Sequence, residues 1–500
     1  MGVPDVCDAT GVGEVMLGLP GFRVLDAQES TELVIVVETA ATLVGCGGCG
    51  VVATAHERME VAYRDLPAFG RPVRLVWRKR RFRCDEQLCA VASWTETSDL
   101  LASRCVLTRR AGLECCLQVG ANARPVAQVA RELGVAWHTV MDAVREYGEP
   151  RVDAPDRVGE VRALGVDETK WLSATRTTRT RYTTGLVDLD ARRVIDVIEG
   201  NSGQALAGWL DEQPKPWRDA VRVVATDLAS SYRAGLDGRL QHALRVADPF
   251  HVVRVANRCL DKVRRRVQNQ TKGHRGRKPD PLYRIRKLLA KGAERLDGSG
   301  LDRMLLELRI GDPDGDVTGA WCAKESVRDI YLTNDPAEAE LLLDTTIEGC
   351  RLDPVDEIQS LGRTLARWRT EITNHHHTAA SNGPTEALNQ LIKRVKHAGH
   401  GFTSFANYRL TILLHAGGVD WSQIRPPTPP ILNAHPTEMR SASLVPCHGQ
   451  SLCSLTAAKL RRILSAYRFS THLRRHAAPA SPRRFCGTRA PGGLPCGGSE

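Results

Sequence analysis

Two apolar runs that each lead into an aspartate constrain the fold of this chain more than any other feature. ALGV is followed by Asp167, and VRVVAT is followed by Asp227. Burying a carboxylate costs free energy unless the group is paired, hydrogen-bonded or bound to a cation. We therefore expect both runs to be central strands of one sheet, each ending on its aspartate. If the two strands are neighbours, their carboxylates lie at the same sheet edge.

The elements expected around these runs define a mixed α/β fold. From Val161 onward, the patterning predicts three strands in hairpin succession, and then helices that alternate with two further strands. The five strands are VRALGV, YTTGLVDL, RRVIDVIEG, AVRVVATD and HALRVAD. This order indicates a mixed sheet with helices packed on it, and the ribonuclease-H-like nuclease core has the same order. A mostly helical insertion at about 255–372 interrupts it, and a helix that carries Glu386 resumes it.

A third carboxylate completes a candidate catalytic triad of Asp167, Asp227 and Glu386. Glu386 lies one turn into a predicted helix whose first residues, SNGP, offer a capping residue and an early proline. Three such carboxylates suit two Mg²⁺ or Mn²⁺ ions about 4 Å apart, which activate an attacking hydroxyl and stabilise the leaving oxygen. Asp248 and His251, in ADPFH, are candidate accessory residues. The alternative for these two is a helix-capping aspartate and a packed histidine.

Two cysteine pairs predict a structural zinc site in a small N-terminal β module at 30–95. The pairs are Cys46-x2-Cys49 and Cys84-x4-Cys89, and 34 residues separate them. Four thiolates bind one Zn²⁺ tetrahedrally, leaving no open position for water, and the glycines of GCGGCG permit the tight turn that such a pair requires. The alternative is two unrelated cysteine pairs in a reducing cytosol. Apolar helical patterns predict core positions for Cys105, Cys115, Cys116 and Cys259.

The segment RPVAQVARELGVAWHTVMDAVREY has the spacing of a helix-turn-helix, which we place in a domain at 98–150. Gly134 is the turn between two predicted helices that each have one apolar face. The second helix is expected to end at Gly148. It is expected to present these side chains toward a major groove: Trp137, His138, Thr139, Asp142 and Arg145. Among them, His138, Thr139 and Arg145 are candidate DNA-binding residues. An ordinary helical hairpin has the same periodicity and is the alternative.

The positive charge of the chain is concentrated in a few segments. The chain has 69 Lys and Arg against 58 Asp and Glu, a formal net charge of +11. Residues 71–83 hold seven basic residues and no acid, and residues 262–287 hold eleven basic residues and one acid. A basic run is often a solvated surface, but two such runs within globular regions favour a polyanion partner. The candidate phosphate contacts are Arg78, Lys79, Arg80, Arg81, Lys272, Arg275, Arg277, Lys278, Lys393, Arg394 and Lys396.

The remaining features indicate a multidomain α+β protein of the cytoplasm. The catalytic core is expected at 160–420. A Ser-, Arg-, Pro- and Gly-rich stretch at 432–500 has the composition of a disordered basic tail. No apolar run approaches the roughly 20 residues that cross a bilayer, so no membrane partner is expected. The odd number of cysteines, 15, and a start without an export signal also favour a cytoplasmic protein.

Taken together, the motifs resemble those of the ISL-three family of insertion-sequence transposases. The resemblance covers about residues 30–420. It rests on the cysteine pairs, the helix-turn-helix, GVDETKW, TDLASSY, ADPFH, KGHRGRKPDPLY and SNGPTEALNQLIKRVKHAGHGFTSFANYR. It implies a DDE transposase with a ribonuclease-H-like catalytic domain, an all-helical insertion and an N-terminal zinc-binding region. By its motifs, it implies the triad Asp167, Asp227 and Glu386, with zinc at the four paired cysteines.

The sequence thus predicts a bacterial transposase that binds double-stranded DNA, both the terminal inverted repeats of its element and the target. Hydrolysis at the element ends would expose 3′-hydroxyls, which then attack target phosphodiesters. Action on two ends suggests a homodimer or a higher assembly, associated with the nucleoid when bound to DNA. One alternative is a zinc-dependent DNA-binding regulator with an inactive nuclease domain. Another is a ribonuclease-H-like nuclease that acts on RNA hybrids or junctions.

Overall fold

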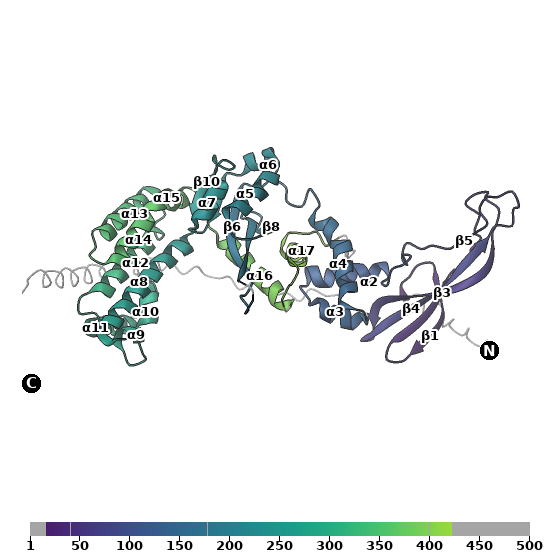
Figure 1. Ribbon diagram of the computed structural model, residues 1–500, viewed down its shortest axis with the longest axis horizontal. Helices are drawn as coiled ribbons and strands as arrows, with labels where there is room; N and C mark the ends of the chain where they lie inside the picture. Colours follow the sequence, from purple (N-terminus) through teal and green to yellow (C-terminus); the bar gives the residue numbers. More distant parts are fainter. Residues whose placement is uncertain (1–16, 41, 178, 400, 423–500) are drawn as a thin grey trace, which may run out of the picture. The chain divides into compact units, whose positions relative to one another are not determined.

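The computed structural model describes residues 17–40, 42–177, 179–399 and 401–422, and it forms two compact units (Figure 1). The first unit contains the described residues up to 248 and those from 370 onward, and the second contains 249–369. The second unit is therefore an insertion in the sequence of the first. The tail predicted at 432–500 lies outside the described residues.

The first unit begins with a five-stranded sheet. Its strands follow the order β1, β2, β4, β3, and β5 pairs with β4. The bounds are β1 Phe22–Glu29, β2 Leu33–Thr39, β3 Thr54–Ala68, β4 Arg71–Arg83 and β5 Ser93–Thr95. Tyr63, Leu75 and Trp77 form the buried centre of this sheet. Sequence patterning does not reveal β1, because most of its side chains are exposed and it shows no regular apolar alternation.

Three helices follow this sheet. They are α2 (Arg109–Cys116), which continues into the π-helical turn η1 (Leu117–Ala121), α3 (Val126–Leu133) and α4 (Trp137–Val152). Thr108 caps α2, since its side chain accepts a hydrogen bond from the backbone N–H of Ala111. Gly134 ends α3 with a φ of 66°, the left-handed region that glycine occupies at little cost. The predicted turn between the two helices is therefore present.

The second helix of this pair, α4, is longer than the sequence predicts. It runs past Gly148 and through Pro150 to Val152. Gly148 is buried, and a Cβ added there would lie 2.9 Å from Cδ1 of Leu414 in α17 (Phe405–Ala416). This glycine therefore permits close packing between two helices and does not end one. The expected helix end at Gly148 was wrong, because the reason for the glycine lies more than 260 residues away in the sequence.

A second five-stranded sheet forms the centre of the first unit. Its strand order is β10, β9, β6, β7, β8. The bounds are β6 Ala163–Leu172, β7 Arg181–Asp188, β8 Arg193–Glu199, β9 Val223–Thr226 and β10 Leu244–Ala247. β6, β9 and β10 run parallel to one another, whereas β7 is antiparallel to both β6 and β8. The sheet is mixed, as the element order predicts.

Helices pack against both faces of this sheet. On one face, Leu164 and Val166 of β6 share a core with α5 (Gly203–Glu212) and α7 (Ser230–Leu236). On the other face, Trp171 of β6 shares a core with α16 (Gly383–Ala398) and α17. The short helix α6 (Lys215–Ala220) leads into β9. Alternate residues of β6 therefore belong to two separate cores, as the two-residue period of a strand requires.

Every regular element that the structure describes in the second unit is a helix. Its elements are α8 (Pro249–Lys272), α9 (Pro281–Arg284), α10 (Arg286–Ala290), the 3₁₀ turn η2 (Ala293–Arg295), α11 (Gly298–Gly311), α12 (Asp316–Ile330), α13 (Pro336–Arg351) and α14 (Asp356–Arg367). The next helix, α15 (Arg369–Thr378), leads back to the first unit. Within the part of the chain that the structure describes, no helix has the length and apolarity needed to span a membrane.

Candidate metal centres

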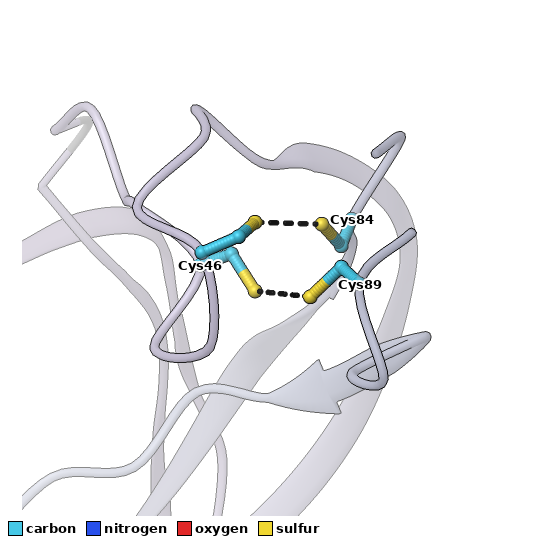
Figure 2. A group of neighbouring side chains, drawn as sticks. Cys46, Cys84 and Cys89 are labelled. Carbon is cyan, nitrogen blue, oxygen red and sulfur yellow. Dashed lines mark hydrogen bonds between the residues drawn. The ribbon is translucent and has the colours of Figure 1, made fainter. Parts of the chain in front are cut away.

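The four paired cysteines lie together beyond the ends of β3 and β4. Figure 2 shows the side chains of Cys46, Cys84 and Cys89 pointing toward the centre of this group. The Sγ atoms of Cys46 and Cys89 are 3.7 Å apart, and those of Cys49 and Cys84 are 3.5 Å apart. All four Sγ atoms lie within 4.8 Å of one another. Tetrahedral zinc with Zn–S bonds of about 2.3 Å places its sulfurs roughly 3.8 Å apart, so this group fits one zinc ion.

The turns that carry the cysteines also orient backbone donors toward sulfur. The N–H of Gly48 donates to Sγ of Cys46, and the N–H of Val91 donates to Sγ of Cys89, each at 3.4 Å. The first of these bonds is the main reason that the pKa of Cys46 is lowered to about 7. Gly50 closes its turn with a φ of 76°, and its N–H donates to the carbonyl of Cys46. At Cys84 and Cys89 a backbone N–H, from Glu86 and Val91, lowers the pKa, but desolvation and hydrogen bonds with neighbouring cysteines raise it further, to about 12 at Cys84. The lowered pKa therefore belongs to Cys46 and not to the whole cluster.

The cysteines expected in the core divide into two groups. Cys115, Cys116 and Cys259 are buried, as predicted. Burial raises the pKa of Cys115 to about 12 and that of Cys116 to about 11, so both remain thiols at neutral pH. The prediction for Cys105 was wrong, because this residue lies in an exposed turn before α2.

Asp167 and Asp227 lie next to each other at one edge of the second sheet. β6 and β9 are parallel, and their last paired residues, Val166 and Thr226, directly precede the two aspartates. Asp227 follows the end of its strand, as expected. Asp167 does not end its strand, because β6 continues to Leu172 by pairing with β7 after its pairing with β9 has ended.

A third aspartate occupies the equivalent position on the next strand. Asp248 directly follows β10, whose last residue, Ala247, pairs with Thr226 of β9. Asp248 is buried, and its Oδ1 accepts a hydrogen bond of 3.2 Å from the backbone N–H of Asn382. It thus holds the segment that leads into α16. His251 is half-buried in the first turn of α8, where its ring contacts that of Phe250.

The carboxylate of Asp167 is held by hydrogen bonds at both oxygens. Oδ1 accepts from the backbone N–H of Glu168 at 2.8 Å, and Oδ2 accepts from Nδ2 of Asn389 at 2.6 Å. Asn389 belongs to α16 and is buried. The acids at this edge also affect Tyr232, whose pKa is raised, mainly by burial and further by the charges of Asp227, Glu168 and Asp167. This sheet edge therefore concentrates negative charge.

α16 packs directly on β6 because β6 has a glycine where the two elements meet. A Cβ at Gly165 would overlap with Oγ1 of Thr385 and would lie 2.9 Å from Oδ1 of Asn382. Both polar residues are buried. Thr385 and Asn389 lie on one helix face, which is the face turned toward β6. The missing side chain at Gly165 therefore allows α16 to approach Asp167.

Glu386 lies in the first turn of α16 with its side chain exposed. Its backbone N–H donates to the carbonyl of Asn382. Within the described residues, the structure does not bring the carboxylates of Glu386, Asp167 and Asp227 within 4.8 Å of one another. It thus brings the two aspartates to adjacent strands and leaves Glu386 on a neighbouring helix surface.

The basic residues of β4, which are candidate phosphate contacts, have partners within the sheet. Arg78 and Arg81 pair with Glu60 and Glu57 of β3, at 3.0 and 3.3 Å. The two basic residues between them are buried. Lys79 lies over the ring of Trp77 at 4.8 Å, and Arg80 donates to the carbonyl of Thr39 at 2.7 Å. The sheet thus supplies partners for these charges, and contact of these residues with phosphate stays a prediction.

The outward face of α4 is polar, and one of its side chains is hydrogen-bonded to another helix of the chain. Trp137 and His138 are exposed, and Thr139 is half-buried. Arg145 donates through Nε and Nη2 to Oδ1 of Asn407 in α17, at 3.2 and 2.9 Å. The first turn of α4 is thus accessible, while Arg145 helps to join α4 to α17.

Two further basic groups remain exposed. The end of α8 and the loop after it present Lys272, Arg275, Arg277 and Lys278, and α16 presents Lys393 and Arg394. No ion pair of these six residues is found within the described part of the chain. Lys396 differs, since its Nζ donates to the carbonyl of Lys170 at 2.9 Å and burial is the main reason that its pKa is lowered.

Models of known protein families match both the region of the paired cysteines and the region of the carboxylates. A family model described as a transposase, that of the ISL3 group of DDE transposases, matches residues 164–412. A second model, described as the zinc-finger of transposase IS204/IS1001/IS1096/IS1165, matches residues 42–89. The two matches together cover more than half of the chain. The chain belongs to the ISL3 family of transposases. Its cysteine cluster is accordingly the zinc ribbon of this ISL3 transposase.

Individual relatives agree with the family. The transposase for insertion sequence element IS1001 from Bordetella parapertussis is 23% identical over 383 residues, which is 74% of this chain and 88% of that protein. The transposase for insertion sequence element IS1557 from Mycobacterium tuberculosis is 27% identical over 309 residues, which is 58% of this chain and 67% of that protein. This ISL3 transposase thus resembles them over most of their length.

Some residues of this ISL3 transposase that surround the carboxylates were not found from the sequence. They are Gly165, Thr169, Asn382, Thr385 and Asn389. Their spacing carries one usable signal, because Thr385 and Asn389 are polar residues four positions apart on a helix that also has an apolar face. Their partners on β6 could not be inferred without the packing of α16.

Proposed function

We propose that this transposase cuts and joins DNA at the edge formed by β6 and β9, with Asp167, Asp227 and Glu386 as metal ligands. The observation that carries the proposal is the position of two aspartates at the same level of adjacent parallel strands. Buried or half-buried carboxylates gathered at one sheet edge are the donor set that Mg²⁺ or Mn²⁺ prefers. When bound, such ions activate the attacking oxygen and stabilise the leaving oxygen.

The order of the second sheet supports a nuclease of the ribonuclease-H-like class. Three antiparallel strands, β8, β7 and β6, continue into two parallel strands, β9 and β10. We expected a mixed sheet for that core, with a helical insertion at about 255–372, and the helical unit at 249–369 lies in the sequence between β10 and the helix of Glu386. We therefore assign residues 160–420 to one catalytic domain with a helical insertion.

The chain's own residues divide the catalytic work. Asp167 is held in one orientation by hydrogen bonds at both oxygens, which suits a ligand of fixed position. Asp227 supplies the neighbouring carboxylate. Glu386 completes the set from α16, where its exposed carboxylate is accessible from solvent and can be drawn toward the aspartates by cations and DNA. Asp248 holds the start of α16 and so acts on Glu386 through the backbone.

DNA recognition is proposed for the segments that present exposed polar and basic groups. The helix pair α3 and α4, with its left-handed turn at Gly134, would act as the helix-turn-helix, using His138 and Thr139 on the terminal inverted repeats. The exposed basic groups at 272–278 and 393–394 would bind phosphates without reading sequence. Because two ends must be joined, we propose that the chain acts as a homodimer or higher assembly on DNA.

The decisive experiment is metal-dependent cleavage of DNA that carries the inverted repeats of the element. Asp167→Asn keeps the shape of the side chain and removes its charge. We expect it to abolish cleavage and strand transfer in Mg²⁺ or Mn²⁺ while repeat binding, measured by mobility shift, stays close to wild type. Asp190→Asn is the matched control, because Asp190 is exposed and follows β7 at the opposite edge of the sheet.

The same assay separates the proposal from a DNA-binding regulator with an inactive nuclease domain. A regulator would bind the repeats and leave them intact in the wild-type protein. Cleavage that persists in Asp167→Asn would refute the assignment of this carboxylate. Cleavage of an RNA–DNA hybrid in preference to repeat DNA would indicate a nuclease of another substrate class.

A further inference from the structure

Asn389 connects the helix of Glu386 to the carboxylate of Asp167. It lies on α16, one turn after Glu386, and is 5% exposed. Its Nδ2 donates to Oδ2 of Asp167 at 2.6 Å, and its Oδ1 accepts from Oγ1 of Thr169 at 2.9 Å. Both partners belong to β6. One buried amide therefore bridges two side chains of the strand that carries the first aspartate.

The chemistry of these groups fixes the direction of the amide. An ionised carboxylate only accepts hydrogen bonds, so the amide nitrogen must face Asp167 and the amide oxygen must face Thr169. The backbone reinforces this arrangement, because the carbonyl of Thr169 accepts from the hydroxyl of Thr183 on β7 at 3.1 Å. Thr183 is buried. Thr183 thus holds the backbone of Thr169. The hydroxyl of Thr169 in turn holds the amide of Asn389 next to Asp167.

We propose that Asn389 is a positioning residue that orients Asp167 for metal binding and fixes the register of α16, and with it Glu386, on β6. This inference rests on the proposed function of the carboxylates. Groups that hydrogen-bond to a metal ligand hold it in one rotamer, so that less freedom is lost when the metal binds. Because Glu386 and Asn389 are three residues apart on one helix, a contact that fixes Asn389 also limits where Glu386 can lie.

The geometry explains why an amide suits this position. Aspartate at 389 would place a second carboxylate against Asp167, and like charges at hydrogen-bond distance repel. Leucine has a similar volume but cannot donate, and alanine would leave a cavity. The donor and the acceptor of the amide are thus both matched to neighbours of Asn389.

The test compares Asn389→Leu with wild type in the full-length, zinc-loaded protein. Binding of Mn²⁺ alone is measured by titration calorimetry, without DNA, and thermal unfolding is measured in parallel. We expect Asn389→Leu to lose about 10- to 100-fold in Mn²⁺ affinity, the usual effect of removing a group that orients a metal ligand. Its melting temperature should fall, because Asp167 and Thr169 each lose a buried hydrogen-bond partner, but the variant should stay folded at the temperature of the titration. Its affinity for repeat DNA should stay near wild type, and excess Mn²⁺ should restore part of the cleavage.

A second variant keeps the proposal testable if Asn389→Leu fails to fold. Thr169→Val removes the hydroxyl that orients the amide, and it should reduce Mn²⁺ affinity by less than tenfold. The inference would be overturned if folded Asn389→Leu bound Mn²⁺ as tightly as wild type. If Asn389→Leu does not fold, the same result with Thr169→Val would overturn it. Asp167→Asn identifies the cause of such a result. If it also keeps full Mn²⁺ affinity, the proposed carboxylate site is itself wrong; if it loses affinity, only the positioning role is refuted.

Discussion

The zinc ribbon and the proposed carboxylate site of this chain differ in the sequence separation of their ligands. The four cysteines come from two short turns joined by one antiparallel pairing, in which Thr54 of β3 lies opposite Arg83 of β4. Their sulfurs already lie at zinc-binding separations. The carboxylates come from β6, β9 and α16, and the last ligand is more than 200 residues from the first. A hairpin completes the first site, whereas the second requires a whole tertiary structure.

This difference indicates different roles for the metals. Four thiolates leave a zinc ion with no open position, so zinc serves the fold of the hairpin. At the proposed carboxylate site Glu386 is exposed and Asp167 is held by hydrogen bonds, so ions bound there would leave room for a substrate oxygen. We expect substitutions at the two centres to separate stability from activity, and four predictions test that separation.

Among these four, the largest effect on the rate of cleavage is expected for Glu386→Gln. Losing a ligand that contributes about 4 kcal/mol to the transition state lowers the rate of cleavage about 1000-fold. Stability should change by less than about 0.5 kcal/mol, because the side chain is exposed. Single-turnover cleavage and thermal unfolding measure the two quantities. Glu212→Gln, an exposed acid at the end of α5, is the control and should change neither. A large loss of stability would show that Glu386 has a structural role.

Cys84→Ser should have the opposite profile. The variant is expected to lose its zinc, measured by metal analysis, and with it a stabilisation on the order of 10 kcal/mol for the turns that hold the cysteines. Hydrogen exchange should then rise in residues 44–53 and 84–92 while β6 and β9 stay protected. Cys105→Ser is the control, because Cys105 is exposed and lies outside the cluster. If exchange rose equally in both sheets, the two centres would not be independent.

Gly165→Ala should damage both stability and metal binding at the carboxylate edge. The added methyl group overlaps with Thr385, so α16 must shift or the core must strain, at about 1–3 kcal/mol. The same shift moves Asn389 and should weaken Mn²⁺ binding. Gly208→Ala in α5 is the matched control, since an added Cβ there would have no described atom within 4 Å outside its own helix turn. That change should stabilise the protein by up to about 1 kcal/mol. Equal effects of the two substitutions would refute close packing at Gly165.

The smallest effects concern the basic residues near each centre. Lys393→Ala with Arg394→Ala removes two exposed charges of α16. The slope of log affinity against log salt concentration should fall by up to about 0.9 for each phosphate that these side chains neutralise. Arg78→Ala with Arg81→Ala removes charges that are already paired with Glu60 and Glu57. This second pair should change affinity by less than about twofold. A larger effect of the β4 pair would mean that DNA displaces those glutamates.

Sequence patterns predicted the features of this protein that depend on residues close together in the sequence. The spacing of Cys46, Cys49, Cys84 and Cys89 was sufficient to predict the zinc ribbon, because glycine-rich turns and one hairpin bring the sulfurs together. Apolar runs predicted the buried strands β6 and β9, and the turn at Gly134 followed from its place between two amphipathic helices. Each of these predictions needed only residues close in sequence or one strand pairing.

Sequence patterns were less informative about residues whose contact partners lie far away in the sequence. Patterning did not reveal the partners of the basic residues of β4: β2 and β3 supply the carboxylates and carbonyls that bind the arginines, and Trp77 lies beneath Lys79. Gly148 was expected to end a helix, but it accommodates Leu414. Asp167 was expected to end its strand, but β7 extends it.

The sequence by itself determined the ligand types, the strands that lead into Asp167 and Asp227, and the family to which the chain belongs. Only the tertiary structure decided which groups hold Asp167, which positive charges remain exposed, and where Glu386 lies relative to the aspartates. The physical reason is that strand and turn preferences depend on neighbouring residues, whereas hydrogen bonds such as that from Asn389 to Asp167 join positions 222 residues apart. Such contacts exist only after α16 has packed on β6 against Gly165.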